Sequence, residues 1–155
     1  LLALTWKDQI KRDLSDCIEI TLNGIESTTV YKQLSEGAFE AVILDWTGAY
    51  PDPEAYLTPL LSCTKIENNN CLKGEAVFSG SFWGENKVQE LLEKSEQSEG
   101  EIRRNSLIKV EQLAAKGNSY LPVWLVKPKA WSLKGISQPE FSRNGLIILK
   151  NLKRD

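Results

Sequence analysis

A run of four apolar residues shortly after a helical pattern constrains the fold more than any other feature of this chain. Residues 41 to 44 read AVIL, which is typical of a strand covered on both faces. Residues 28 to 36 place apolar side chains at helical spacing, and Gly37 follows as a natural C-terminal stop. A buried strand that follows an amphipathic helix favours a sheet covered by helices.

The same alternation of elements extends along the chain. Residues 4 to 14 have the period of an amphipathic helix, and residues 17 to 22 (CIEITL) alternate apolar and polar side chains as a half-buried strand does. The later expected elements are helices at about 86 to 96 and 99 to 116, a strand at 121 to 126, and an apolar stretch at 146 to 149. Ser98 and Glu101 have the spacing of a capping box for the last helix, which is expected to close at Gly117. This order predicts an α/β fold with a central mixed sheet flanked by helices.

A short helix is expected between the first buried strand and these later helices. Asp52 can cap it, Pro53 suits its first turn, and Pro59 limits it to one or two turns. The polar residues 62 to 81 that follow predict a long loop.

The chain contains no histidine, and this absence narrows the classes of function. Ser–His and Cys–His nucleophile pairs are excluded because they need histidine. The chain also lacks the residue that is the commonest general base and metal ligand. The three cysteines match no zinc spacing, and we find no carboxylate pair suited to acid–base catalysis. We therefore expect no catalytic residue, no metal site and no cofactor.

The charge and hydropathy patterns argue against two classes of partner. The net charge of -2 is a mixture of both signs without a basic stripe, so we expect no nucleic-acid partner. No apolar run approaches the ~18 residues that a membrane span requires. Because the sequence has no initiator Met and opens within a helical pattern, we interpret it as a fragment of a longer protein.

Two longer stretches carry a resemblance to a known family. One is YKQLSEGAFEAVILDWTGAYPDPEAYL, at residues 31 to 57, which combines a helix, a Gly-x-Phe turn, a strand, a tryptophan and an Asp-Pro pair. The other is FWGENKVQELLEKSEQSEGEIRRNSLIKVEQLAAKGNSYLPVWLV, at residues 82 to 126, with paired helices, an arginine that opens the second helix and a proline in the next strand. In order and spacing, residues 4 to 127 resemble the C-terminal part of the extracellular solute-binding proteins of ABC importers, the oligopeptide- and nickel-binding family.

This resemblance implies a lobe of periplasmic-binding-protein-like fold (type II) from a two-lobed receptor. Residues 1 to 127 would form the ligand-binding lobe, and residues 128 to 155 would return toward the other lobe. Such receptors close around an extracellular solute, often an extended peptide, and deliver it to a membrane permease without catalysis. The resemblance further implies a monomer in the periplasm or outside the cell, with or without a lipid anchor on the full-length protein.

Trp46 is the strongest candidate for a ligand contact. It matches the tryptophan that lines the cleft in this family, and ligands of open α/β sheets bind outside the carboxyl ends of strands. The alternative is a structural tryptophan that packs under the next helix. Thr47, Gly48 and Tyr50 lie along the same edge, where Gly48 would let a ligand backbone approach and a peptide could add as a β-strand. Tyr50 is as readily explained by packing.

The position three residues after Trp46 departs from the family's pattern. Peptide-binding members usually have an aspartate there to pair with the peptide's amino terminus, whereas this chain has Ala49. A buried ammonium group without a partner is costly, so this chain lacks the usual means of recognising a free-amine peptide. Asp45 could supply a charge from the other side of Trp46 or cap a neighbouring turn, and both interpretations stay open.

The cysteines are interpreted from the exported location that the resemblance implies. In an exported receptor, a disulfide between Cys63 and Cys71 is expected to close the Asn-rich loop. The alternative is two free thiols in a cytosolic protein. Cys17 is expected to be a small buried hydrophobic residue, or to pair with a part of the protein outside this chain.

Three other tryptophans have packing as their first interpretation. Trp83 is expected to pack the long loop onto the paired helices, with a place in the cleft as the alternative. Trp124 and Trp131 flank the strand that returns toward the other lobe, and both are expected to pack in the core or between the lobes.

The leading hypothesis is therefore a receptor lobe that binds peptide. A receptor for a non-peptide solute, such as an oligosaccharide or a metal chelate, is the main alternative, and Ala49 favours it. A small α/β enzyme would need two converging acids that the sequence does not offer. A structural or regulatory interaction domain derived from a binding protein is the remaining alternative.

Overall fold

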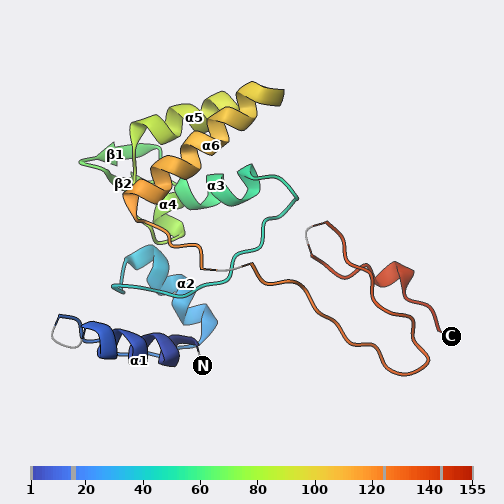
Figure 1. The fold of residues 1–155 in the computed structure, drawn as a ribbon. Helices are drawn as coiled ribbons and strands as arrows, with labels where there is room; N and C mark the ends of the chain where they lie inside the picture. Colours follow the sequence, from blue (N-terminus) through green and yellow to red (C-terminus); the bar gives the residue numbers. More distant parts are fainter. Residues whose placement is uncertain (1, 15–16, 124, 144, 155) are drawn as a thin grey trace. The chain divides into compact units, whose positions relative to one another are not determined.

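The computed structural model describes residues 2–14, 17–123, 125–143 and 145–154 (Figure 1). The chain divides into two compact units, Leu1–Lys32 and Gln33–Asp155. The described residues form six α-helices, one 3-10 helix and one two-stranded antiparallel sheet. The fold is therefore a mixture of helix and sheet, but this sheet is much smaller than the central mixed sheet that the sequence predicts.

The first unit contains α1 (Leu2–Leu14) and the beginning of α2 (Ser27–Glu36), both close to their predicted positions. The strand expected at residues 17 to 22 is not formed, and its side chains Ile18 and Leu22 are exposed. Alternation of apolar and polar side chains does not by itself make a strand, because a strand needs a hydrogen-bonded partner. Among the described residues, none pairs with this stretch.

The core of the second unit lies between α3 (Glu54–Leu61), α5 (Asn86–Glu96) and α6 (Gly100–Gly117). The helices α5 and α6 pack side by side, as Figure 1 shows. One cluster of buried side chains joins the three helices: Leu61, Val88, Leu91, Leu92 and Val110. Full burial of such a side chain is worth about 1.5–3 kcal/mol, so this cluster contributes strongly to the stability of the unit.

Residues 62 to 81 form a compact structure and not the long loop that the sequence predicts. The strands β1 (Lys65–Glu67) and β2 (Asn70–Lys73) pair as an antiparallel hairpin, and α4 (Glu75–Phe78) follows. The hairpin turn is Asn68–Asn69, with φ of +50° and +62°, a conformation that asparagine adopts more readily than most residues. The Asn-rich run therefore supplies the turn residues of the hairpin.

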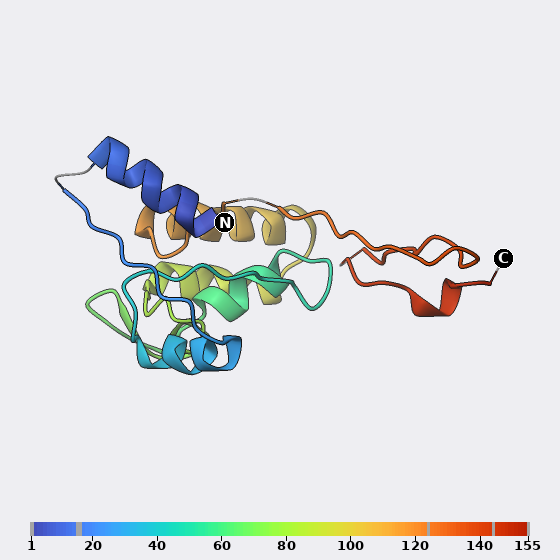
Figure 2. The ribbon, with the colours of Figure 1, turned by 90° about the horizontal axis from the view of Figure 1, so that it is seen from below.

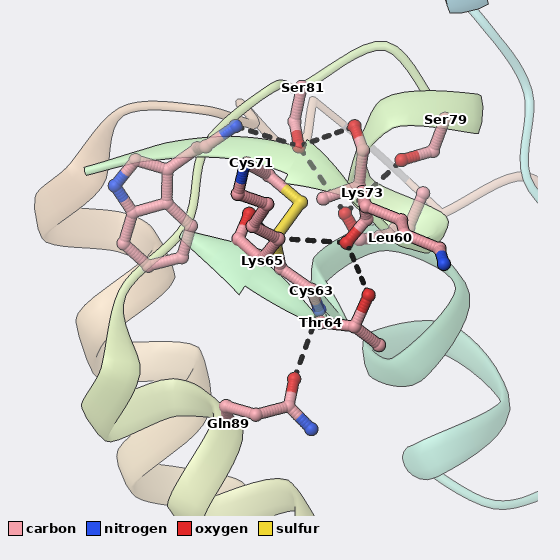
Figure 3. Close-up of a disulfide and its surroundings, with 11 residues drawn as sticks. Leu60, Cys63, Thr64, Lys65, Cys71, Lys73, Ser79, Ser81 and Gln89 are labelled. Atoms are coloured by element: carbon pink, nitrogen blue, oxygen red, sulfur yellow. Dashed lines mark hydrogen bonds between the residues drawn. A yellow bond between two sulfur atoms is a disulfide. The ribbon is translucent and has the colours of Figure 1, made fainter. Parts of the chain in front are cut away.

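The expected disulfide between Cys63 and Cys71 is confirmed (Figure 3). Its Cα atoms lie 5.8 Å apart, and the two residues are only 3% and 2% exposed. The Cys63 amide also donates a hydrogen bond to Gln89 Oε1 on α5 at 3.0 Å, which ties the hairpin to the helix pair. Cys17, expected to be buried, is instead an exposed free thiol.

Aromatic side chains fix the segment around α4 to the helix pair. Trp83 packs against the helical core, as the sequence predicts, and its ring lies so close to Gly117 that a Cβ there would be 2.6 Å from Trp83 Cε2. Tyr120 donates a hydrogen bond to Ser79 Oγ at 2.8 Å, and burial raises the pKa of its phenol. The hydroxyl of Ser79 in turn donates to the Leu60 carbonyl at the end of α3 at 3.2 Å (Figure 3).

The two ends of α6 differ in part from the expectation. The capping box is not formed, because the Ser98 hydroxyl donates to the Lys94 carbonyl at the end of α5. At the other end, the last helical residue is Gly117, but Asn118 takes the left-handed conformation that terminates the helix, with φ of +52°. The helix boundaries were thus predictable, while the cap at its start was not.

Two further predicted strands are irregular segments without sheet partners among the described residues. Residues 41 to 44 lie in no ladder or bridge, and their bulky side chains are exposed instead of buried on both faces. The described part of 121 to 126 is likewise unpaired and exposed, and Trp124 lies outside the described residues. An apolar run favours burial in a sheet only when neighbouring strands are present to cover it.

The described residues from 128 to 154 form a looping chain with little regular structure (Figure 2). It contains the isolated bridges Ile136–Arg154 and Phe141–Ile147 and the 3-10 helix η1 (Leu149–Asn151). Trp131 is 87% exposed, so it does not pack into the core, and packing between the lobes stays a prediction. The division of roles at residue 127 stays a prediction.

The disulfide should contribute measurably to stability. Replacing both cysteines, Cys63→Ser with Cys71→Ser, is expected to lower the free energy of unfolding by about 2.5 kcal/mol, because the open loop gains entropy in the unfolded chain. Urea unfolding followed by circular dichroism measures this change. The control Cys17→Ser removes an exposed thiol and should leave the unfolding midpoint unchanged. A double variant as stable as the parent chain would contradict the prediction.

Candidate functional site

The predicted site residues lie between α2 and α3, in a part of the chain without helix or strand. We call residues 45 to 50 the edge segment. Five of these six residues are exposed, and Gly48 is the buried one. Trp46 is 44% exposed, so its ring is accessible to a ligand and is not core filler. The other four exposed residues are neighbours of Trp46 in the chain, and this proximity would bring them to the same ligand. They are Asp45, Thr47, Ala49 and Tyr50.

The segment that leads into the edge segment is anchored at the end of α2. Leu34 is buried, and its side chain lies against Gly80 so closely that a Cβ there would be 2.8 Å from Leu34 Cδ2. Gly37 takes φ of +65° and ends α2 as predicted, with its position packed against Phe82. These contacts hold the start of this segment on the disulfide-linked part of the unit.

Gly48 has a different role from the predicted one. A Cβ at this position would lie 2.6 Å from Tyr56 Cε2, so the space above Gly48 is occupied by the ring of Tyr56 from α3. The glycine therefore permits close approach of a helix side chain, while the sequence suggests close approach of a ligand backbone. The contact fixes the middle of the edge segment to α3.

Asp52 caps α3 as predicted, and it also forms an ion pair that the sequence does not reveal. The Glu54 amide donates to Asp52 Oδ1 at 2.9 Å. Arg103 of α6 donates to both carboxylate oxygens of Asp52, at 2.9 Å and 2.8 Å, and to Glu54 Oε2 at 2.6 Å. Such forked arginine–carboxylate pairs are directional and strong among hydrogen bonds.

The electrostatics of this cluster follow from the fork. The hydrogen bonds from the Arg103 guanidinium hold the pKa of Asp52 below its ordinary value, and the two carboxylates raise the pKa of Arg103. The three side chains are 26%, 30% and 20% exposed for Arg103, Asp52 and Glu54, so water screens the cluster only in part. The pairing joins residues 51 positions apart in the chain, which is why sequence patterns did not indicate it.

A groove of about 470 Å³ lies beside this ion pair, between the start of α3 and α6. Its lining residues are Pro53, Gly100, Arg103, Arg104, Leu107, Ile108 and Glu111. None of the predicted edge residues lines it. Among the described residues, no three Cys, Asp or Glu side chains lie together as a metal site would require.

Comparison with protein-family models and with curated proteins finds no match for this chain. In the described ranges, no helix has the length and apolar character needed to cross a membrane.

The pH dependence of stability tests the Asp52 ion pair. Because the folded pKa of Asp52 is lowered from 3.8, the pair stabilises the fold fully above that value, and the stabilisation is lost as the pH falls below 3.8 toward the folded pKa. We expect Asp52→Asn to have a flatter profile of unfolding free energy than the parent chain between about pH 2 and pH 6. Urea unfolding at a series of pH values measures both profiles.

The matched control for this measurement is Glu67→Gln. Its carboxylate pairs with Lys65 at 3.2 Å in an exposed position, where an ion pair contributes little. The control profile should follow that of the parent chain. Parallel profiles for Asp52→Asn and the parent chain would show that the Arg103 fork does not stabilise the fold.

Proposed function

We propose that this chain is the ligand-binding lobe of the solute-binding component of an ABC importer, with peptide as the ligand class. The observation that carries the proposal is the position of Trp46. Its half-exposed ring belongs to the edge segment, which contacts a helical unit at Gly48 and is followed by Asp52, paired with the same unit. An aromatic ring held in this way is suited to cover a ligand when a second lobe closes over it.

The backbone of the preceding segment supports the same ligand class. Residues 41 to 47 are in neither helix nor strand and take part in no sheet pairing among the described residues. Amide and carbonyl groups of such a segment can bind an extended peptide as an added strand, which gives affinity without selecting side chains. This is the behaviour that a peptide importer requires.

Two other features are compatible with the proposal. The chain has no histidine, so the commonest general base of enzymes is missing. The buried Cys63–Cys71 disulfide is compatible with a periplasmic or extracellular location. In the proposed mechanism, the receptor is a monomer that closes around the solute and releases it to the membrane permease.

A non-peptide solute is the second candidate, and Ala49 is the observation that favours it. Its methyl group stands where a carboxylate would pair with a peptide's amino terminus, three residues after Trp46. A neutral solute, such as an oligosaccharide, needs no such charge and would stack on the exposed indole ring. Blocked or internal peptide backbone would be tolerated for the same reason.

Substitution of Trp46 tests the proposal directly. In the full-length receptor that carries this chain, Trp46→Ala is expected to weaken binding of a short-peptide library by roughly 30-fold, since buried tryptophan anchors commonly contribute at this level. Intrinsic tryptophan fluorescence measures the affinity. The control Trp131→Ala removes an exposed ring outside the edge segment and should leave affinity unchanged. Equal binding by Trp46→Ala and the parent protein would contradict the proposal.

Restoring the carboxylate at position 49 separates the two ligand classes. Ala49→Asp is expected to improve binding of tetra-alanine with a free amino terminus by about tenfold or more, because a charge-assisted hydrogen bond becomes available. Acetylated tetra-alanine, which has no ammonium group, serves as the matched probe and should gain nothing. If neither peptide binds in either variant while an oligosaccharide does, the ligand is not a peptide.

A further inference from the structure

We infer that Arg103 is a positioning residue for the ligand contact. Its fork to Asp52 fixes the direction in which the edge segment enters α3, and thereby the orientation of Trp46. This inference rests on the proposed function, in which Trp46 covers the ligand. It assigns to a side chain on α6 a role at the edge segment, which contains no residue of α6.

The first support is the geometry of the fork. Both oxygens of Asp52 accept from Arg103, at 2.9 Å and 2.8 Å, so the carboxylate plane cannot rotate without breaking a bond. The third bond, from Arg103 to Glu54 Oε2, holds the first turn of α3 in the same arrangement. Three bonds to one guanidinium therefore define the start of α3 relative to α6.

The second support is the short connection between this fork and the edge segment. The Asp52 amide donates to the Tyr50 carbonyl at 2.9 Å, which closes a three-residue turn around Pro51. Proline fixes its own φ, so this turn has little freedom. A displacement of the Asp52 backbone would consequently be passed to Tyr50 and the residues before it.

The third support is the contact between Gly48 and Tyr56. Tyr56 belongs to α3, two residues after Glu54, so the edge segment touches the same helix at a second point. Two points of attachment, one at Asp52 and one at Gly48, determine the path of the residues between them. Trp46 lies two residues before Gly48, the second point of attachment. Only Asp45 separates Trp46 from residues 41 to 44, which have no strand partner among the described residues.

A comparison of two neighbouring arginines tests the inference. Arg103→Gln removes the fork, whereas Arg104→Gln removes a guanidinium that is 73% exposed and lies 3.9 Å from Glu101. Each variant is prepared with 5-fluorotryptophan, and every ¹⁹F resonance is assigned by a single Trp→Phe substitution. We expect the Trp46 resonance to move in Arg103→Gln and to stay in place in Arg104→Gln.

The other tryptophans report whether the fold is intact. The resonance of Trp83, which is partly buried against the helical core, should be unchanged in both variants when the helical unit is folded. If Arg103→Gln does not fold, Arg103→Lys replaces it, because lysine keeps the charge but cannot form the planar fork. A Trp46 resonance that stays in place in a folded fork-deficient variant would overturn the inference and leave a structural ion pair.

Affinity measurements separate this inference from the proposed function. In the full-length receptor, Arg103→Gln is expected to bind acetylated tetra-alanine about tenfold more weakly, while Arg104→Gln binds it as the parent does. If Trp46→Ala leaves binding unchanged, the proposed function fails whatever Arg103 does. If Trp46→Ala weakens binding and the folded Arg103→Gln does not, the positioning role alone is refuted.

Discussion

The fork between Arg103 and Asp52 is the interaction on which the arrangement of the second unit depends. It joins α6 to the start of α3, and Asp52 at the same time caps α3 and closes the turn that leads back to the edge segment. The helical core beneath it is apolar and supplies stability, but apolar contacts are not directional. The fork supplies the direction, since a guanidinium and a carboxylate share a plane when both hydrogen bonds form.

The periodic features of the sequence predicted most of the helices but not which segments pair as strands. Helices α5 and α6 lie where the 3.6-residue period places them, because their apolar faces pack on each other and the pattern is local. Strands depend on partners elsewhere in the chain, so CIEITL and AVIL have the composition of strands but do not form them here. The hairpin at 65 to 73 was missed because its side chains are mostly polar and therefore do not have the composition of a strand. Its turn at Asn68–Asn69 was the one available signal.

The candidate site was predictable only as a stretch of chain. The position of Trp46 between an apolar run and a helix start indicated an accessible aromatic ring, and the ring is half-exposed. What holds it there was hidden, because Tyr56 over Gly48 and Arg103 on Asp52 are tertiary contacts without a sequence motif. The proposed receptor function draws on both kinds of information: the order of motifs suggests the class of protein, and the tertiary contacts explain how one residue could be presented to a solute.

The contact between Trp83 and Gly117 has a consequence for how this sequence can change. A side chain at position 117 would collide with the indole ring, and a smaller residue at position 83 would open a cavity between the disulfide hairpin and the helix pair. Neither position can therefore vary alone without a loss of stability. Among related sequences the two positions should be inherited together, with a tryptophan at one accompanied by a glycine at the other, and a larger residue at 117 only where the aromatic ring has been lost.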